Sequence, residues 1–159
     1  MDYQKLKSWA LLAEIFGGLA VLVTLVVLVL EVQSNTQTLR ASTYDSLIAD
    51  LGNWRIENAR NDSLLEIRFI IDTEGREALS PKQALLNVET VVSLFLIYER
   101  AYIQWEAGNL NTNGWERFRR AICLRSGDQA FEERYGSPID FVLTRNFRDY
   151  RHNNCDSET

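Results

Sequence analysis

The stretch WALLAEIFGGLAVLVTLVVLVLEVQSNT, Trp9 to Thr36, determines the first structural element of this 159-residue chain. No residue from Ile15 to Leu30 carries a charge, and Glu14 is the only charged residue among the apolar ones before them. A bilayer core of about 30 Å requires about 20 apolar helical residues, which this run supplies. A cleaved signal peptide would have a shorter apolar region followed by a small-residue cleavage site, whereas this run ends in Glu31. We therefore expect a permanent transmembrane anchor.

The residues behind the anchor have the apolar periodicity of helices. Ser80, Pro81 and Gln83 match a capping box with proline in the first helical position, and a long apolar pattern from Leu85 to Trp105 follows. No useful length of sequence alternates with a period of two, so almost no sheet is expected. The sequence predicts an all-α protein with one N-terminal transmembrane helix, followed by a small helical-bundle domain of about four to six helices.

The chain divides into three predicted segments. Residues 1–33 form the anchor, residues 34–150 the soluble helical domain, and residues 151–159 a polar tail that we expect to be frayed. The apolar run ALLNVETVVSLFLIY, from Ala84 to Tyr98, is too short for a comfortable second span and contains Asn87 and Glu89. We interpret it as a buried helix of the soluble domain.

The charge distribution argues against nucleic acid as a partner. The net charge is −5, and the basic residues are scattered and do not form a patch. Arg117, Arg119, Arg120 and Arg125 lie close together on one predicted helix, where we interpret them as a solvated face.

Catalytic and metal-binding patterns are absent from the sequence. His152 and Cys155 offer two ligands on the predicted tail, whereas structural zinc requires four and catalytic zinc three plus water. No nucleophile is accompanied by a recognisable base, and no glycine-rich phosphate loop occurs. We expect no enzyme activity, no cofactor and no metal.

The two cysteines, Cys123 and Cys155, have neither metal-binding nor redox-motif spacing. Cys123 belongs to an apolar pattern and is predicted to be a small core residue. Cys155 lies in the predicted polar tail and is expected to be exposed. A disulfide between them can form only if the domain faces an oxidising compartment; in the cytoplasm both would be free thiols.

Small side chains gather on one face of the expected transmembrane helix. At about 100° per residue, Ala13, Gly17, Ala20, Thr24 and Glu31 share one stripe, and Glu14 borders it. Small residues allow helices to approach closely in lipid, and an ionisable group in a span usually faces protein or water. We therefore predict that copies of the chain associate through this stripe. Glu14 also lies near enough to one end to sit at headgroup level, and both interpretations can hold.

Two functions follow from self-association. In the first, the chain is a homo-oligomeric, membrane-anchored scaffold or partner-binding protein. In the second, the oligomer is a pore or ion channel with Glu14, Thr24 and Glu31 on its axis. Large aliphatic residues at Val21 and Leu28, on or beside the stripe, favour the scaffold because they would fill a tight bundle. Membrane lipid and further copies of the chain are the expected partners, with a protein partner as a further option.

Aromatic residues of the soluble domain offer a second candidate site. A partner-binding groove is one interpretation of Tyr102, Trp105, Trp115 and Phe118, and a packed core at helical spacing is the other.

Four short motifs stand out along the chain: Ala13-Glu14-Ile15 with Gly17, Asn35-Thr36, Leu39-Arg40-Ala41, and YERAYIQWEAG from Tyr98 to Gly108. Through these motifs the chain resembles a family of small, uncharacterised bacterial membrane-anchored proteins. The resemblance implies a single span in the bacterial inner (plasma) membrane and a helical soluble domain, and it brings no activity.

The evidence on sidedness is divided. Lys5 and Lys7 before the span favour a cytoplasmic N-terminus. The family resemblance implies a cytoplasmic soluble domain, and on balance we expect the domain on that side.

Overall fold

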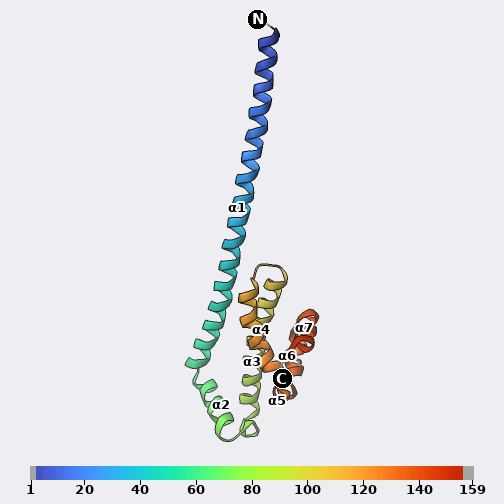
Figure 1. Ribbon diagram of the computed structural model, residues 1–159. Helices are drawn as coiled ribbons and strands as arrows, with labels where there is room; N and C mark the ends of the chain where they lie inside the picture. Colours follow the sequence, from blue (N-terminus) through green and yellow to red (C-terminus); the bar gives the residue numbers. More distant parts are fainter. Residues whose placement is uncertain (1–2, 156–159) are drawn as a thin grey trace. The chain divides into compact units, whose positions relative to one another are not determined.

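The computed structural model of the protein describes the backbone of residues 3–155 and the side chains of Trp9, Glu14 and residues 16–155. All secondary-structure elements of the described residues are helical and none is a strand, which confirms the all-α prediction (Figure 1). It divides into two compact units, Met1–Leu39 and Arg40–Thr159, and the division falls within the first helix, α1 (Tyr3–Arg60).

The first unit consists of the apolar part of α1. By length and composition, this helix could cross a membrane. Every side chain from Phe16 to Leu30 is exposed within the single chain. The unit ends after Leu39, a few residues beyond the predicted boundary at Gln33, because Arg40 already belongs to the helical domain: its Nε donates a hydrogen bond of 3.0 Å to the carbonyl of Gly108.

The second unit begins with the last part of α1 and contains eight further helical segments within the described residues. These are α2 (Asp62–Thr73), the 3₁₀ turn η1 (Arg76–Ala78), α3 (Pro81–Glu106), α4 (Thr112–Ser126), α5 (Gln129–Phe131), the π-helical η2 (Glu132–Gly136), α6 (Ser137–Val142) and α7 (Arg145–Cys155). The predicted capping box at Ser80 and Gln83 is confirmed at the start of α3. Gly108 follows α3 at a φ of +74°, a conformation that glycine adopts without steric cost.

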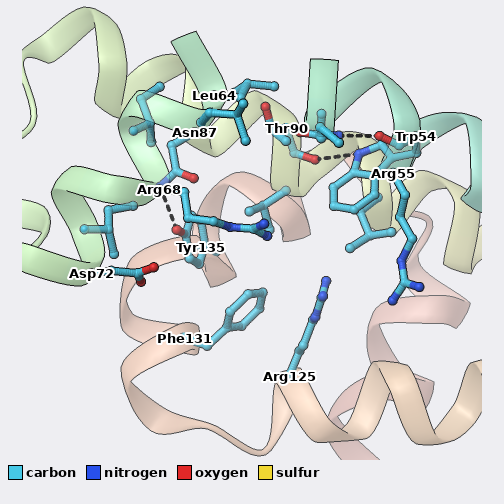
Figure 2. A pocket seen from close by; sticks show the side chains of 17 residues that line it. Trp54, Arg55, Leu64, Arg68, Asp72, Asn87, Thr90, Arg125, Phe131 and Tyr135 are labelled. Atoms are coloured by element: carbon cyan, nitrogen blue, oxygen red, sulfur yellow. Dashed lines mark hydrogen bonds between the residues drawn. The ribbon is translucent and has the colours of Figure 1, made fainter. Parts of the chain in front are cut away.

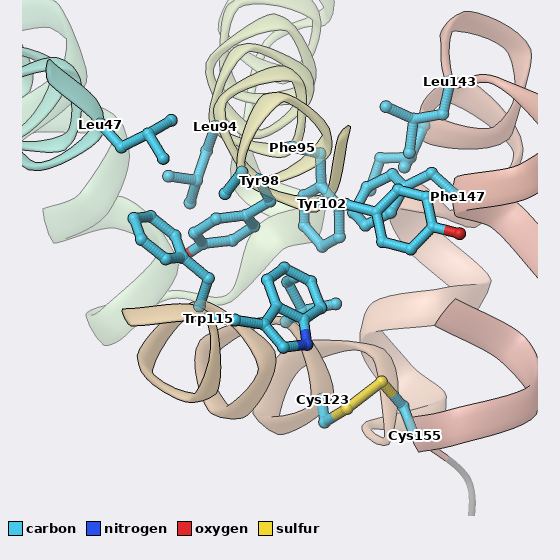
Figure 3. Packing of buried hydrophobic residues seen from close by; sticks show 14 of the residues in the cluster. Leu47, Leu94, Phe95, Tyr98, Tyr102, Trp115, Cys123, Leu143, Phe147 and Cys155 are labelled. Atoms are coloured by element: carbon cyan, nitrogen blue, oxygen red, sulfur yellow. A yellow bond between two sulfur atoms is a disulfide. The ribbon is translucent and has the colours of Figure 1, made fainter. Parts of the chain in front are cut away.

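Helix α3 carries the centre of the hydrophobic core (Figure 3). Phe95 is fully buried, with Tyr98 at its edge and Phe131 stacked on it at a centroid distance of 5.6 Å. Leu47 brings the last part of α1 into the same core. The run from Ala84 to Tyr98 is therefore part of a helix of the second unit that buries one face in the core, as the sequence predicted.

The C-terminal residues differ from the predicted polar tail. Helix α7 continues to Cys155, and the side chain of Arg151 is fully buried. Its two terminal nitrogens pair with the carboxylates of Glu132 and Asp140, the latter at 2.7 Å. These partners offset the loss of water around the guanidinium group, which is why a charged residue can belong to the core.

Cys123 and Cys155 form a disulfide that joins α4 to the end of α7 (Figure 3). Cys123 is buried in the core, as predicted. The expectation that Cys155 is exposed is wrong, because α7 places it against α4 and leaves it 2% exposed. Both residues are therefore structural cysteines of the domain.

We predict that reduction of this disulfide lowers the free energy of unfolding by about 3 kcal/mol, because the bridge closes a loop between residues 32 positions apart and so restricts the unfolded chain. Denaturant unfolding of the full chain in detergent, followed by tryptophan fluorescence, measures the loss with and without reductant. The variant Cys155→Ser is the control and should be insensitive to reductant. Equal stability of the oxidised and reduced parent would contradict the prediction.

Candidate functional site

The predicted stripe on the span lies along the exposed surface of the first unit. Glu14, Ala20, Thr24 and Glu31 are all exposed, and a Cβ added at Gly17 would meet no atom within 4 Å. Ala20 and Thr24 lie together at a shallow hollow that is also lined by Val21, Leu25 and Leu28. Thr24 satisfies its own hydroxyl by donating to the Ala20 carbonyl at 2.9 Å. The side chain of Ala13 lies outside the described residues.

The predicted aromatic groove is a packed contact in the core. Tyr102, Trp115 and Phe118 are buried, and Trp105 is half-buried and stacked on Trp115 at a centroid distance of 4.9 Å. Burial, and secondarily Glu106, raise the pKa of the Tyr102 hydroxyl to about 12. The groove interpretation is wrong for the three buried residues, because α3 and α4 use these side chains to pack against each other. Tyr102, Trp115 and Phe118 belong instead to the packed core, which was the alternative interpretation.

A cleft that the sequence did not reveal lies within the second unit. It has a volume of about 600 Å³ and is lined by residues of α1, α2, α3, α4, α5 and η2 (Figure 2). Small-molecule sites in proteins usually range from about 300 to 1,000 Å³. Ile67 and Leu94, both 2% exposed, belong to its apolar lining.

Three arginines line the cleft: Arg55 on α1, Arg68 on α2 and Arg125 on α4. In Figure 2, the side chains of Arg68 and Arg125 extend into the cleft near the ring of Phe131. Arg125 is half-buried, while Arg55 and Arg68 are exposed. Asp72 is the one carboxylate in the lining, and it forms no ion pair with Arg68 among the described residues.

A smaller cavity of about 220 Å³ adjoins this cleft and shares four residues with it, among them Arg55 and Arg125. Both guanidinium groups also act on the hydroxyl of Tyr98: burial raises the pKa of Tyr98, and Arg125 and Arg55 oppose that rise. These two arginines, from helices α1 and α4, therefore lie in the same region of the domain. They concentrate positive charge where the two cavities meet.

Hydrogen bonds hold the polar side chains of the cleft in place. The indole nitrogen of Trp54 donates to the Thr90 carbonyl at 3.2 Å and to the Ser93 hydroxyl at 3.0 Å. The amide nitrogen of Asn87 donates to the Tyr135 hydroxyl at 2.8 Å. Because these groups bind each other, the three arginines and Asp72 are the charged groups of the lining that keep bonding capacity to spare.

One feature of the sequence around Arg55 is typical of an arginine that faces a cavity. Arg55 has no aspartate or glutamate three or four positions away on its helix, so it lacks the usual local ion-pair partner. We had interpreted Arg125 as part of a solvated face. Only the packing of α1 and α2 against α4 brings Arg55, Arg68 and Arg125 to one cavity.

Comparison with known proteins adds no assignment. No family model, curated protein or solved structure matches the chain. Among the described residues, no group of three or more histidine, cysteine, aspartate or glutamate side chains is placed to hold a metal ion. The chemistry of the site must therefore be argued from its own residues.

We predict that Trp115→Ala lowers the free energy of unfolding by about 3–5 kcal/mol, because it removes a buried aromatic side chain from the contact between α3 and α4. Denaturant unfolding of the full chain in detergent measures the change. Phe141→Ala is the matched control, since that ring is 90% exposed and its loss should cost less than about 0.5 kcal/mol. Unchanged stability of Trp115→Ala would restore the groove interpretation.

Proposed function

We propose that the chain is a membrane-anchored helical scaffold or partner-binding protein that assembles as a homo-oligomer through its transmembrane helix. One observation carries the proposal: every side chain from Phe16 to Leu30 is exposed within a single chain, although nearly all are apolar. So large an exposed apolar surface requires lipid or protein around it. The role is assembly and binding, without a catalytic step.

The small stripe supports contact between copies. Gly17 has free space around its Cα, and the hollow beside Ala20 and Thr24 can accept a side chain from a second helix. Close packing of backbones is a main source of helix association in lipid, where no hydrophobic drive exists between helices. Glu14 would then meet another copy, water or the headgroups, and would avoid the cost of facing hydrocarbon.

A pore is the alternative form of the same assembly, and the lining of the hollow favours the scaffold. Val21, Leu25 and Leu28 line it together with Ala20 and Thr24. A helix packed against this face would meet bulky aliphatic groups, which fill the axis of a tight bundle. Conductance of the purified oligomer in planar bilayers distinguishes the two forms.

The disulfide between Cys123 and Cys155 favours a soluble domain outside the cytoplasm, the opposite side from the one expected from the sequence. Disulfides persist in oxidising compartments and are rare in the cytoplasm. Lys5 and Lys7 before the span independently favour a cytoplasmic N-terminus. We therefore replace the cytoplasmic location expected for the soluble domain: the proposed orientation is N-terminus inside and domain outside the plasma membrane, in keeping with the bacterial inner-membrane location that the family resemblance implies.

Gly17→Leu should disrupt the oligomer, because the added side chain separates backbones that pack closely at the stripe. Crosslinking in membranes, followed by denaturing electrophoresis, measures the oligomer. Leu22→Ala is the control on the opposite, lipid-facing side and should leave the oligomer intact. If Gly17→Leu assembles as the parent does, the stripe is not the interface.

The orientation is tested with a cysteine introduced at an exposed position of the domain. Phe141→Cys should react with a membrane-impermeant maleimide in intact spheroplasts, because Cys123 and Cys155 are occupied by their disulfide and the new thiol is outside. Lys5→Cys, before the span, should react only after lysis. The reverse pattern would return the domain to the cytoplasm.

A further inference from the structure

The arginine-lined cleft carries an excess of positive charge, because three arginines share its lining with the single carboxylate of Asp72. Among the described residues, neither Arg55, Arg68 nor Arg125 has a hydrogen-bond or ion-pair partner, although other arginines of the domain do. Arg151, for comparison, is paired with two carboxylates. Positive groups that share a cavity repel one another, and solvent screens this repulsion least at the half-buried Arg125. An anion bound between them would remove this cost.

The remainder of the cleft is apolar and aromatic. Ile67 and Leu94 are almost completely buried beneath it, and the half-buried ring of Phe131 stands beside the two arginines that extend into it (Figure 2). A bare inorganic ion would leave most of the 600 Å³ volume, and all of this apolar lining, unused. The site therefore matches an anion that carries an apolar body.

We propose that this cleft binds a small organic carboxylate with an aromatic or other planar apolar body. Guanidinium groups bind carboxylates through paired, charge-assisted hydrogen bonds, which favours a carboxylate head at Arg125 with Arg55 or Arg68 beside it. The body then lies over Leu94 and against the ring of Phe131.

Asp72 limits where the head can lie. It is the one carboxylate in the lining and sits one helical turn from Arg68 on α2. Repulsion between Asp72 and the ligand favours the other end of the cleft, where Arg55 and Arg125 also border the adjoining cavity. The carboxylate head is therefore attracted most strongly at the side of the cleft formed by Arg55 of α1 and Arg125 of α4.

The proposed binding goes beyond assembly through the span. All the residues that form the cleft belong to the unit Arg40–Thr159, so the site does not require the oligomer. Loss of the oligomer in Gly17→Leu and loss of carboxylate binding in an arginine variant are separate results.

The test is calorimetric titration of the full chain, in micelles of a neutral detergent, with 2-naphthoate. The matched neutral compound 2-naphthamide has nearly the same shape and apolar area, so the comparison isolates the carboxylate and requires no variant. We expect 2-naphthoate to bind at least about tenfold more tightly, because charge-assisted hydrogen bonds are roughly twice as strong as neutral ones. Equal affinities, or no binding of 2-naphthoate, would overturn the proposal.

Two variants locate the head group. Arg125→Gln and Arg55→Gln should each weaken 2-naphthoate binding about tenfold while leaving 2-naphthamide unchanged, since each removes a charged hydrogen-bond donor. Arg120→Gln is the matched control on the same helix α4; its side chain is 74% exposed and does not line the cleft, so binding should be unchanged. If Arg120→Gln weakens 2-naphthoate binding equally, the attraction comes from the general surface charge of the domain, and the proposed location of the site is wrong.

Inorganic phosphate provides the last comparison. If phosphate binds in the same titration as tightly as 2-naphthoate does, the cleft is a simple anion site and the proposed apolar body is wrong. Phosphate binding that is at least about tenfold weaker supports the apolar body, because burial of apolar surface adds to the charge interaction.

Discussion

The packing of aromatic side chains on α3 is the interaction on which the rest of the helical domain depends. Tyr102 contacts Trp115 of α4 and Phe147 of α7, with centroid distances of 6.0 and 5.3 Å. One turn and two turns earlier, Tyr98 and Phe95 continue the same face of the helix. Since α3 is the helix that the others cover, its aromatic face fixes where α4 and α7 lie. Both the disulfide and the cleft follow from those positions.

Polar groups also fix the C-terminal segments, in addition to their buried apolar residues Ile139, Leu143 and Phe147. Glu99, buried on α3, accepts a hydrogen bond of 2.6 Å from the backbone nitrogen of Thr144, just before α7 begins. Arg151 joins α7 to η2 and α6 through Glu132 and Asp140. A buried pair of this kind is strongly destabilising to break, because it leaves a charge without a partner. The short helices are thus held by specific partners as well as by apolar contact.

The two units meet different physical demands. From Phe16 to Leu30, where α1 is apolar, every side chain is exposed within the single chain, and an apolar surface of this size is unfavourable in water. The helical domain buries its own core and leaves a cleft with positive charge in its wall. The proposed assembly and the proposed ligand binding therefore use separate surfaces of the chain.

The sequence by itself determined the helical elements and the apolar segment that is long enough to cross a membrane. Uncharged residues from Ile15 to Leu30, helical apolar periodicity and the cap at Ser80 are local features, so they can be interpreted without knowing what lies beside them. The stripe through Gly17 was also visible, because residues of one helix share a face at fixed spacing.

Only the tertiary structure decided which polar residues are buried and which charges gather. Arg151 and Cys155 lie in a polar sequence context that is typical of a tail. In the structure Arg151 forms ion pairs with Glu132 and Asp140, and Cys155 forms a disulfide with Cys123. Trp115 and Phe118 fit a groove or a core equally well until α3 covers them. The cleft joins Arg55 and Arg125, which lie 70 positions apart in the sequence, and it exists only where α1 and α4 come together. Contacts between distant segments depend on the packing of whole helices, and local sequence patterns do not encode that packing.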